Sequence, residues 1–374
     1  MATVKRGSKV KKGLKFFNFG DAGTWKSSFA LDFLKMKSEE GKPLRVLYID
    51  CETGSVDNYL EDLEDEGVNL DNLLLVYTTN YAEVEEFANK AMNEEDIFIE
   101  NEVVLDAEGN PFRADVIVVD GISVIADNVK FAAINVSEKR AKLKAKSQEK
   151  NASEQLVAES TAGLEFKDHD KIKMKGKQLM RSLVTNTDKY VVVTSREKMK
   201  RKMANVDGKM QLVDQGITHM SFPESEYEFY TVLRHFEDED GTIKAQVVRK
   251  DRTKVFAQNE IIDDPTPLYW QSVIDGNKNK EANILKDNYA DSIEKDEDVV
   301  ASGFNKKNED QKEVEVKLET VEDYQKAIQE SMDKLDNVKK KALLPKVKKA
   351  KLPLDFKAIT DVKQLHEFLG LVKG

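Results

Sequence analysis

The stretch GDAGTWKSS, residues 20–28, stands between an apolar run, LKFFNF at 14–19, and a segment whose apolar residues recur at helical spacing. A strand, a glycine-containing turn and a helix in this order form a loop whose backbone N–H groups converge on phosphate oxygens. The pattern G-x-x-x-x-G-K-[ST] is met at Gly20, Lys26 and Ser27. The stretch therefore predicts a phosphate-binding loop at the end of a strand.

A tryptophan, Trp25, stands where this pattern has its second glycine. Glycine lets the backbone approach a phosphate because it has no Cβ. Two outcomes stay open: either Gly20 and Gly23 set the turn while the indole points outward, or the loop is degenerate. In the first case Lys26 would reach the β and γ phosphates of ATP and Ser27 would ligate Mg²⁺. The candidate nucleotide-binding residues of the loop are Gly20, Asp21, Ala22, Gly23, Thr24, Trp25, Lys26, Ser27 and Ser28.

Composition excludes several other classes of protein. The 374 residues suffice for one large domain and a smaller one, and a net charge of −10 confines any polyanion site to a local patch. The single cysteine, Cys51, excludes an internal disulfide framework, and the four histidines show no metal-ligand spacing. No apolar run approaches the roughly 18 residues of a membrane span. We therefore expect a cytoplasmic protein without a membrane partner.

Apolar runs alternate with amphipathic segments from residue 14 to about residue 274, which predicts an α/β fold with a mostly parallel central sheet flanked by helices. Among the expected strands are ADVIVVDGISVI at 114–125 and KYVVVTS at 189–195. Two late strands, 227–235 and 243–249, are close enough in sequence to be antiparallel.

Composition also divides the chain into three expected parts. Residues 1–275 form the core, and the polar and acidic residues 276–316 form a charged, disordered linker. Residues 317–374 form a small helical C-terminal segment, with helices expected near 320–335 and 362–371.

Two carboxylates are placed where a nucleotide site needs them. The strand VIVVD ends in Asp120, and ligands of parallel α/β sheets bind at the carboxyl ends of the strands. Asp120 is therefore the candidate, with Ser27, for supporting Mg²⁺. Glu52 follows the strand RVLYID and is placed to orient and deprotonate an attacking water.

Three stretches resemble the core of RecA-type recombinases in order and spacing: LYIDCE, NLLLVYTTNYAEVEEFA and ADVIVVDGISVI. The resemblance covers roughly residues 14–257. It implies a RecA-like P-loop NTPase core, and it looks closest to the phage-type RecA-like P-loop ATPases, which are encoded beside recombination genes. Some of those proteins act with single-strand-annealing or single-strand-binding proteins, so such a partner is expected here.

The resemblance also implies roles for individual residues. Glu52 corresponds to the catalytic glutamate, and Lys26 acts with it. Lys250 and Arg252 in RKDR correspond to basic residues that reach the γ phosphate of a neighbouring subunit, which implies a homo-oligomeric ring or filament. Ser195 and Arg196 stand where the family has a polar γ-phosphate sensor, although this chain has no glutamine or asparagine there.

RecA-type proteins bind single-stranded DNA through two loops after the fourth and fifth strands, and this chain has basic insertions at both places. Clustered cations can pair with phosphates without reading sequence, although neither insertion has an aromatic residue for stacking bases. The candidate DNA-binding residues are Lys139, Arg140, Lys142, Lys144 and Lys146 in the first insertion and Lys198, Lys200, Arg201 and Lys202 in the second.

The sequence thus predicts an Mg²⁺-dependent, DNA-dependent ATPase that assists phage DNA recombination, strand annealing or replication in the cytoplasm of an infected bacterial cell. A ring-type DNA helicase or translocase is an alternative, because such enzymes use the same core. A second alternative is a nucleotide-binding adaptor in which Trp25 has abolished turnover.

Overall fold

The structure is a computed structural model. It describes residues 6–52, 54, 56–206, 209–282, 284, 321–333, 347, 350, 352–353, 355–359 and 361–373. Contacts divide the chain into two units, Met1–Asn288 and Tyr289–Gly374. Most of the linker expected at 276–316 lies outside the described residues.

The first unit is built on a nine-stranded sheet with the order β11-β10-β9-β1-β7-β6-β2-β3, and β8 pairs with β7 off this path. Neighbouring strands from β9 to β3 are parallel, whereas β10 and β11 are antiparallel additions at one edge. The small strands β4 and β5 form a separate pair. The strands are β1 Lys15–Gly20, β2 Val46–Asp50, β3 Leu73–Tyr77, β4 Phe98–Ile99, β5 Glu102–Val103, β6 Val116–Asp120, β7 Tyr190–Val206, β8 Lys209–His219, β9 Thr231–Glu237, β10 Ile243–Asp251 and β11 Ile261–Asp263.

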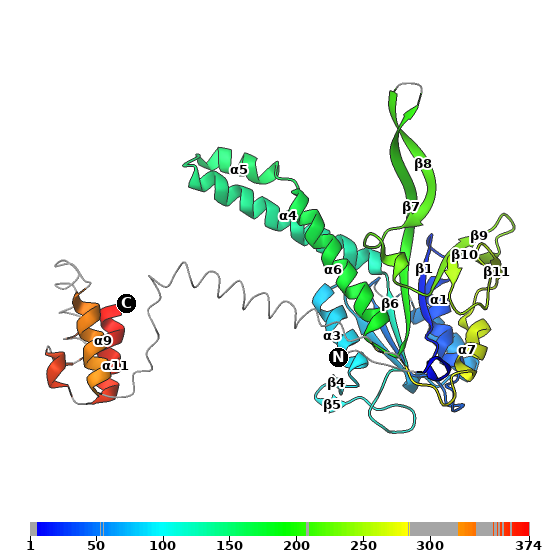
Figure 1. The fold of residues 1–374 in the computed structure, drawn as a ribbon, viewed down its shortest axis with the longest axis horizontal. Coiled ribbons are helices and arrows are strands. Elements are labelled where there is room, and N and C mark those ends of the chain that lie inside the picture. The colour runs from blue at the N-terminus through cyan, green and yellow to red at the C-terminus, as the bar shows by residue number, and fades with distance from the viewer. Residues whose placement is uncertain are drawn as a thin grey trace. The chain divides into compact units, whose positions relative to one another are not determined.

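Helices cover both faces of this sheet (Figure 1). The core on one face contains side chains of α3, α4 and α6, and the core on the other face contains side chains of α1, α2 and α7. Because both faces are covered, strands such as VIVVD are apolar throughout instead of alternating. The helices of this unit are α1 Lys26–Leu31, α2 Leu60–Asp65, α3 Tyr81–Met92, α4 Ile122–Ser147, α5 Ala152–Ser160, α6 Phe166–Thr185 and α7 Gln271–Asp275.

The predicted α/β fold class, with a mostly parallel sheet flanked by helices, is confirmed, and so is the antiparallel pairing of the late strands. The strand expected over 114–125 is shorter than predicted, since β6 ends at Asp120. Gly121 then adopts φ +84° and α4 begins at Ile122. The positive φ, which glycine adopts readily, turns the chain from strand to helix.

Both basic insertions form regular secondary structure in place of the expected loops. The first belongs to α4, which spans 26 residues and continues into α5. In the second, β7 runs on past the sheet and pairs with β8 as a two-stranded ribbon. Figure 1 shows α4 with α5, and β7 with β8, projecting from the sheet as separate arms.

The second unit contains the two helices expected near 320–335 and 362–371, observed as α9 Val321–Asp333 and α11 Val362–Lys373. They share a core of their own, which includes Ile328, Leu365 and Phe368. Among the described residues of both units, no helix is long and apolar enough to cross a membrane.

Candidate functional site

The predicted phosphate loop begins at Gly20, the last residue of β1, where the neighbouring strand β9 comes very close. A Cβ at this position would lie 2.2 Å from the carbonyl oxygen of His235 and 2.9 Å from Thr24 Oγ1. A 2.2 Å approach to backbone cannot be relieved by a side-chain movement, so only glycine fits. Burial lowers the pKa of His235 to about 3, so this ring is neutral beneath the loop.

The loop backbone keeps a glycine-like conformation at the tryptophan. Trp25 has φ 57° and ψ 26°, the left-handed region, and Gly23 has φ 75°. The indole is 48% exposed, so much of it faces solvent. An L-residue in this conformation costs roughly 1–2 kcal/mol. The chain therefore retains the turn that the missing glycine would supply, at the expense of local strain.

Lys26, the first residue of α1, folds its side chain back over the loop. Its Nζ donates hydrogen bonds to the carbonyl oxygen of Asp21 and, at 3.2 Å, to Thr24 Oγ1. Burial lowers the pKa of Lys26, while the nearby carboxylates of Glu52 and Asp120 act to raise it. The ammonium group is thus drawn toward the loop and the carboxylates beside it.

Asp120 ends β6 and is held by two hydroxyl groups. Ser27 Oγ donates to Asp120 Oδ2 at 2.9 Å, and Thr194 Oγ1 donates to Oδ1. Oxygen ligands suit Mg²⁺, which usually takes one or two protein oxygens together with phosphate and water. The described residues hold no cluster of three or more His, Cys, Asp or Glu side chains that suits a metal. The oxygens of Ser27 and Asp120 are of the type and number that fit a metal shared with a phosphate ligand.

Glu52 is held by three features that surround the end of β2. Asp50 accepts hydrogen bonds from the backbone N–H of Glu52 at 2.7 Å and of Gly54 at 2.9 Å, which fixes the turn. The Glu52 side chain then lies over Gly121, where a Cβ would come within 2.3 Å of Glu52 Cγ. Its Oε1 accepts from Arg196 Nε at 2.9 Å. The carboxylate is thereby directed across β6 toward β7.

Sequence reasoning assigned no role to Asp50 or Thr194. Asp50 is fully buried, and it ends a buried apolar strand as Asp120 does, so the same strand-end pattern could have found it. The two carboxylates are register partners on β2 and β6. Thr194 has a weaker signal, one hydroxyl after a run of valines, although it binds both Asp120 and the backbone N–H of Gly121.

Three further site residues were predicted on β7 and at or just after the end of β10: Ser195, Lys250 and Arg252. Thr231, which begins β9, is the register partner of both Phe16 and Asp251, so Arg252 lies near the start of β1, at the opposite end from Gly20. The side chain of Lys250 lies outside the described residues. Ser195 is buried, and its hydroxyl donates to the carbonyl oxygen of Arg196 at 3.1 Å.

Three of the cations predicted to bind DNA form ion pairs with carboxylates. Arg140 binds Asp168 at 3.0 Å, Lys142 binds Glu159 at 2.7 Å, and Arg201 binds Asp214 at 3.0 Å. Strand alternation places Arg201 on one face of β7 and Lys198, Lys200 and Lys202 on the other. The remaining candidates, Lys139, Lys144 and Lys146, lie along the end of α4.

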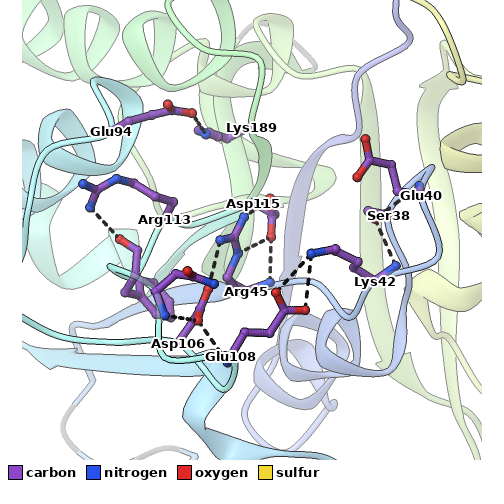
Figure 2. Close-up of polar contacts among 12 residues, drawn as sticks. Ser38, Glu40, Lys42, Arg45, Glu94, Asp106, Glu108, Arg113, Asp115 and Lys189 are labelled. Carbon is purple, nitrogen blue, oxygen red and sulfur yellow. Dashed lines mark hydrogen bonds and ion pairs between the residues drawn. The ribbon is translucent and has the colours of Figure 1, made fainter.

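A cavity of about 670 Å³ lies at the other edge of the sheet, where β2 and β6 begin. Its charged side chains pair with one another: Arg45 binds Asp115 at 2.9 Å and Asp106 at 3.2 Å, and Lys42 binds Glu108 at 3.0 Å (Figure 2). Ligands of parallel sheets bind at the carboxyl ends of the strands. We therefore place the candidate site at the phosphate loop.

Comparison with known proteins adds little to this geometry. No protein-family model matches the chain, and no curated protein shows significant similarity to it. Among solved structures, the chain is similar to a KaiC-like protein from the hyperthermophilic archaeon Pyrococcus horikoshii, at 16% identity and a TM-score of 0.32. That match covers 69% of this chain and 99% of the other. The function therefore has to be inferred from the residues of the site.

Proposed function

We propose that this chain is a RecA-like ATPase of phage type that binds single-stranded DNA and hydrolyses ATP in response, in DNA recombination, strand annealing or replication. One observation carries the proposal. The phosphate loop, the Ser27–Asp120 pair at 2.9 Å and the carboxylate of Glu52 meet at a single edge of the sheet. Together they supply the phosphate, metal and proton-accepting groups that phosphoryl transfer to water needs.

Each group has a distinct task in this proposal. Lys26 would exchange its contacts within the loop for the β and γ phosphate oxygens of ATP. Ser27 and Asp120 would hold Mg²⁺, which neutralises charge on the phosphates when bound. Glu52 would orient a water molecule and accept its proton. Asp50 positions Glu52 through the turn.

Arg252 and Lys250 would act in a neighbouring subunit of a ring or filament. The Arg252 side chain is exposed, and its guanidinium lies 5.1 Å from the ring centre of Tyr230. It lies near the end of the sheet opposite the loop of its own chain, so only assembly with a second copy would bring it to a γ phosphate.

Replacing the tryptophan of the loop tests whether the loop tolerates it. Trp25→Gly is expected to change the affinity for Mg·ATP by less than about tenfold, because the backbone already has the conformation that glycine prefers. Trp25→Val is expected to weaken binding by about 5- to 150-fold, since a β-branched residue strains at positive φ by roughly 1–3 kcal/mol. Calorimetric titration measures both. Equal affinity of the valine variant and the wild type would show that this conformation is not needed.

The lysine face of β7, defined as Lys198, Lys200 and Lys202, is expected to bind the phosphates of single-stranded DNA. The affinity falls as salt rises, and each phosphate contact contributes about 0.7 to the steepness of log affinity against log salt concentration. Replacing all three lysines with glutamine should therefore make this dependence less steep by about 2. Fluorescence anisotropy with an oligothymidylate measures this slope. A matched control replaces three exposed lysines elsewhere, Lys12, Lys37 and Lys278. An unchanged slope in the β7 variant would place DNA binding elsewhere.

Hydrolysis itself tests the proposal as a whole. Purified protein should hydrolyse Mg·ATP, and single-stranded DNA should raise the rate. The helicase alternative predicts strand separation in addition, and the adaptor alternative predicts ATP binding without turnover.

A further inference from the structure

Arg196 connects the proposed catalytic glutamate with the DNA-binding ribbon. Its Nε lies 2.9 Å from Glu52 Oε1. The Arg196 side chain is 56% exposed, whereas that of Glu52 is 25% exposed. The guanidinium is therefore open to a second anion while it binds the carboxylate.

The backbone of Arg196 lies where β7 leaves the sheet. It is the register partner of Gly20, the first residue of the phosphate loop. The next residue, Glu197, already pairs with His219 of β8, and the backbone N–H of Met220 donates to the Arg196 carbonyl at 2.7 Å. Arg196 thus lies beside the proposed phosphate loop and also at the point where the β7–β8 ribbon leaves the sheet.

Arg196 also continues the lysine face of β7. Side chains at every second residue of a strand share a face and lie about 6.6 Å apart, so Arg196 follows Lys198, Lys200 and Lys202 in one row. The pairing of β7 with β8 shifts once, between the pairs Met199–Ile217 and Arg201–Asp214. One residue of β7 lies between these pairs, whereas two residues of β8 do, so the extra residue belongs to β8. The alternation along β7 is therefore unbroken, and the row leads from the ribbon directly to Glu52.

We propose that Arg196 is a positioning residue whose guanidinium binds the Glu52 carboxylate when DNA is absent and a DNA phosphate when DNA is bound. Without DNA, the guanidinium binds the Glu52 carboxylate, so this carboxylate is engaged and not available to orient a water molecule. A phosphate backbone that follows the lysine row reaches Arg196 next, and guanidinium binds phosphate in a bidentate manner. Exchange of partners releases Glu52 to act on water. This inference rests on the proposed function and names how DNA regulates the same site.

The test compares Arg196→Gln and Arg196→Lys with the wild type, in steady-state ATP hydrolysis with and without a saturating oligothymidylate. Arg196→Gln is expected to raise the DNA-free kcat by about two- to fivefold, which is the factor in rate that corresponds to the free energy of an exposed ion pair. The ratio of DNA-stimulated to DNA-free kcat should fall toward one, with KM for ATP unchanged. Arg196→Lys should restore part of that ratio, because it keeps the charge.

A matched control is Arg113→Gln, which removes the guanidinium that binds Asp96 at 2.5 Å on another part of the surface. Both rates of this variant should equal those of the wild type. A wild-type stimulation ratio retained in Arg196→Gln, or a lowered DNA-free kcat with stimulation intact, would overturn the inference about Arg196 alone. No turnover by the wild type would overturn the proposed function, and this inference with it.

Discussion

Replacing Glu52 with glutamine is expected to lower ATP turnover by about 100- to 10,000-fold, the range that general bases contribute. Glutamine keeps the shape of the side chain and its approach to Gly121. It cannot accept a proton from water, so the chemical step loses its base. Affinity for Mg·ATP should stay within about tenfold of the wild type, because Lys26, Ser27 and Asp120 are unchanged.

Single-turnover hydrolysis and a parallel binding titration measure the two effects separately. Glu61→Gln is the matched control, because Glu61 is an exposed acid at the start of α2. Its turnover should equal that of the wild type. Near-normal turnover of the Glu52 variant would assign the base to another residue and remove Glu52 from the proposed mechanism.

Replacing Asp251 with asparagine is expected to lower the free energy of unfolding by about 3 kcal/mol, because an amide donor would face donors in a buried site. Asp251 is buried between the proposed finger residues Lys250 and Arg252. Its carboxylate accepts hydrogen bonds from the side chains of Thr231, Thr253 and Trp270 and from the backbone N–H groups of Thr253, Val255 and Phe256. It therefore fixes the turn that carries Arg252.

The effect of this change depends on pH in a defined direction. Burial raises the pKa of Asp251, but hydrogen bonds from Thr253 and Thr231 outweigh it, so the pKa lies below the ordinary 3.8. The charged carboxylate therefore stabilises the fold fully above about pH 4, and this contribution is lost as pH falls through the lowered pKa. The difference between wild type and variant should shrink below that pH.

Urea unfolding at about pH 7 and about pH 3 measures this change in the free energy of unfolding. Asp263→Asn is the matched control, since that side chain is 76% exposed and pairs with Lys244 at the surface. It should cost less than about 1 kcal/mol at either pH. A loss of stability in Asp251→Asn that does not change with pH would contradict the role of the charged carboxylate.

Much of the arrangement of the candidate site could be predicted from sequence, because its signals are local. A glycine, a lysine and a serine at fixed spacing placed the loop, and Asp120 and Glu52 were found at the ends of apolar strands. Parallel strands bring such ends together without any side-chain contact being known. The same reasoning left the consequence of Trp25 open, since its backbone conformation depends on the rest of the loop.

The pairing of charges could not be predicted in the same way. Arg196 and Glu52 are 144 residues apart in sequence, and only the order β2-β6-β7 brings them together. The second basic insertion contains the dipeptide Asp207-Gly208, which is typical of a two-residue hairpin turn. This signal was missed, so the ribbon and its separate lysine face were not predicted. The strand expected over 114–125 was too long, because one glycine at positive φ ends it amid apolar residues.

Calorimetric titration of Mg·ATP into the wild type and Lys26→Ala tests the central claim most directly, namely that the loop at residues 20–28 holds a nucleotide. We predict saturable binding by the wild type and a loss of affinity of about 10- to 100-fold in the variant, the range for a charged hydrogen bond. No binding by the wild type, or equal affinity in both proteins, would contradict the claim and mark the loop with Trp25 as one that no longer binds nucleotide.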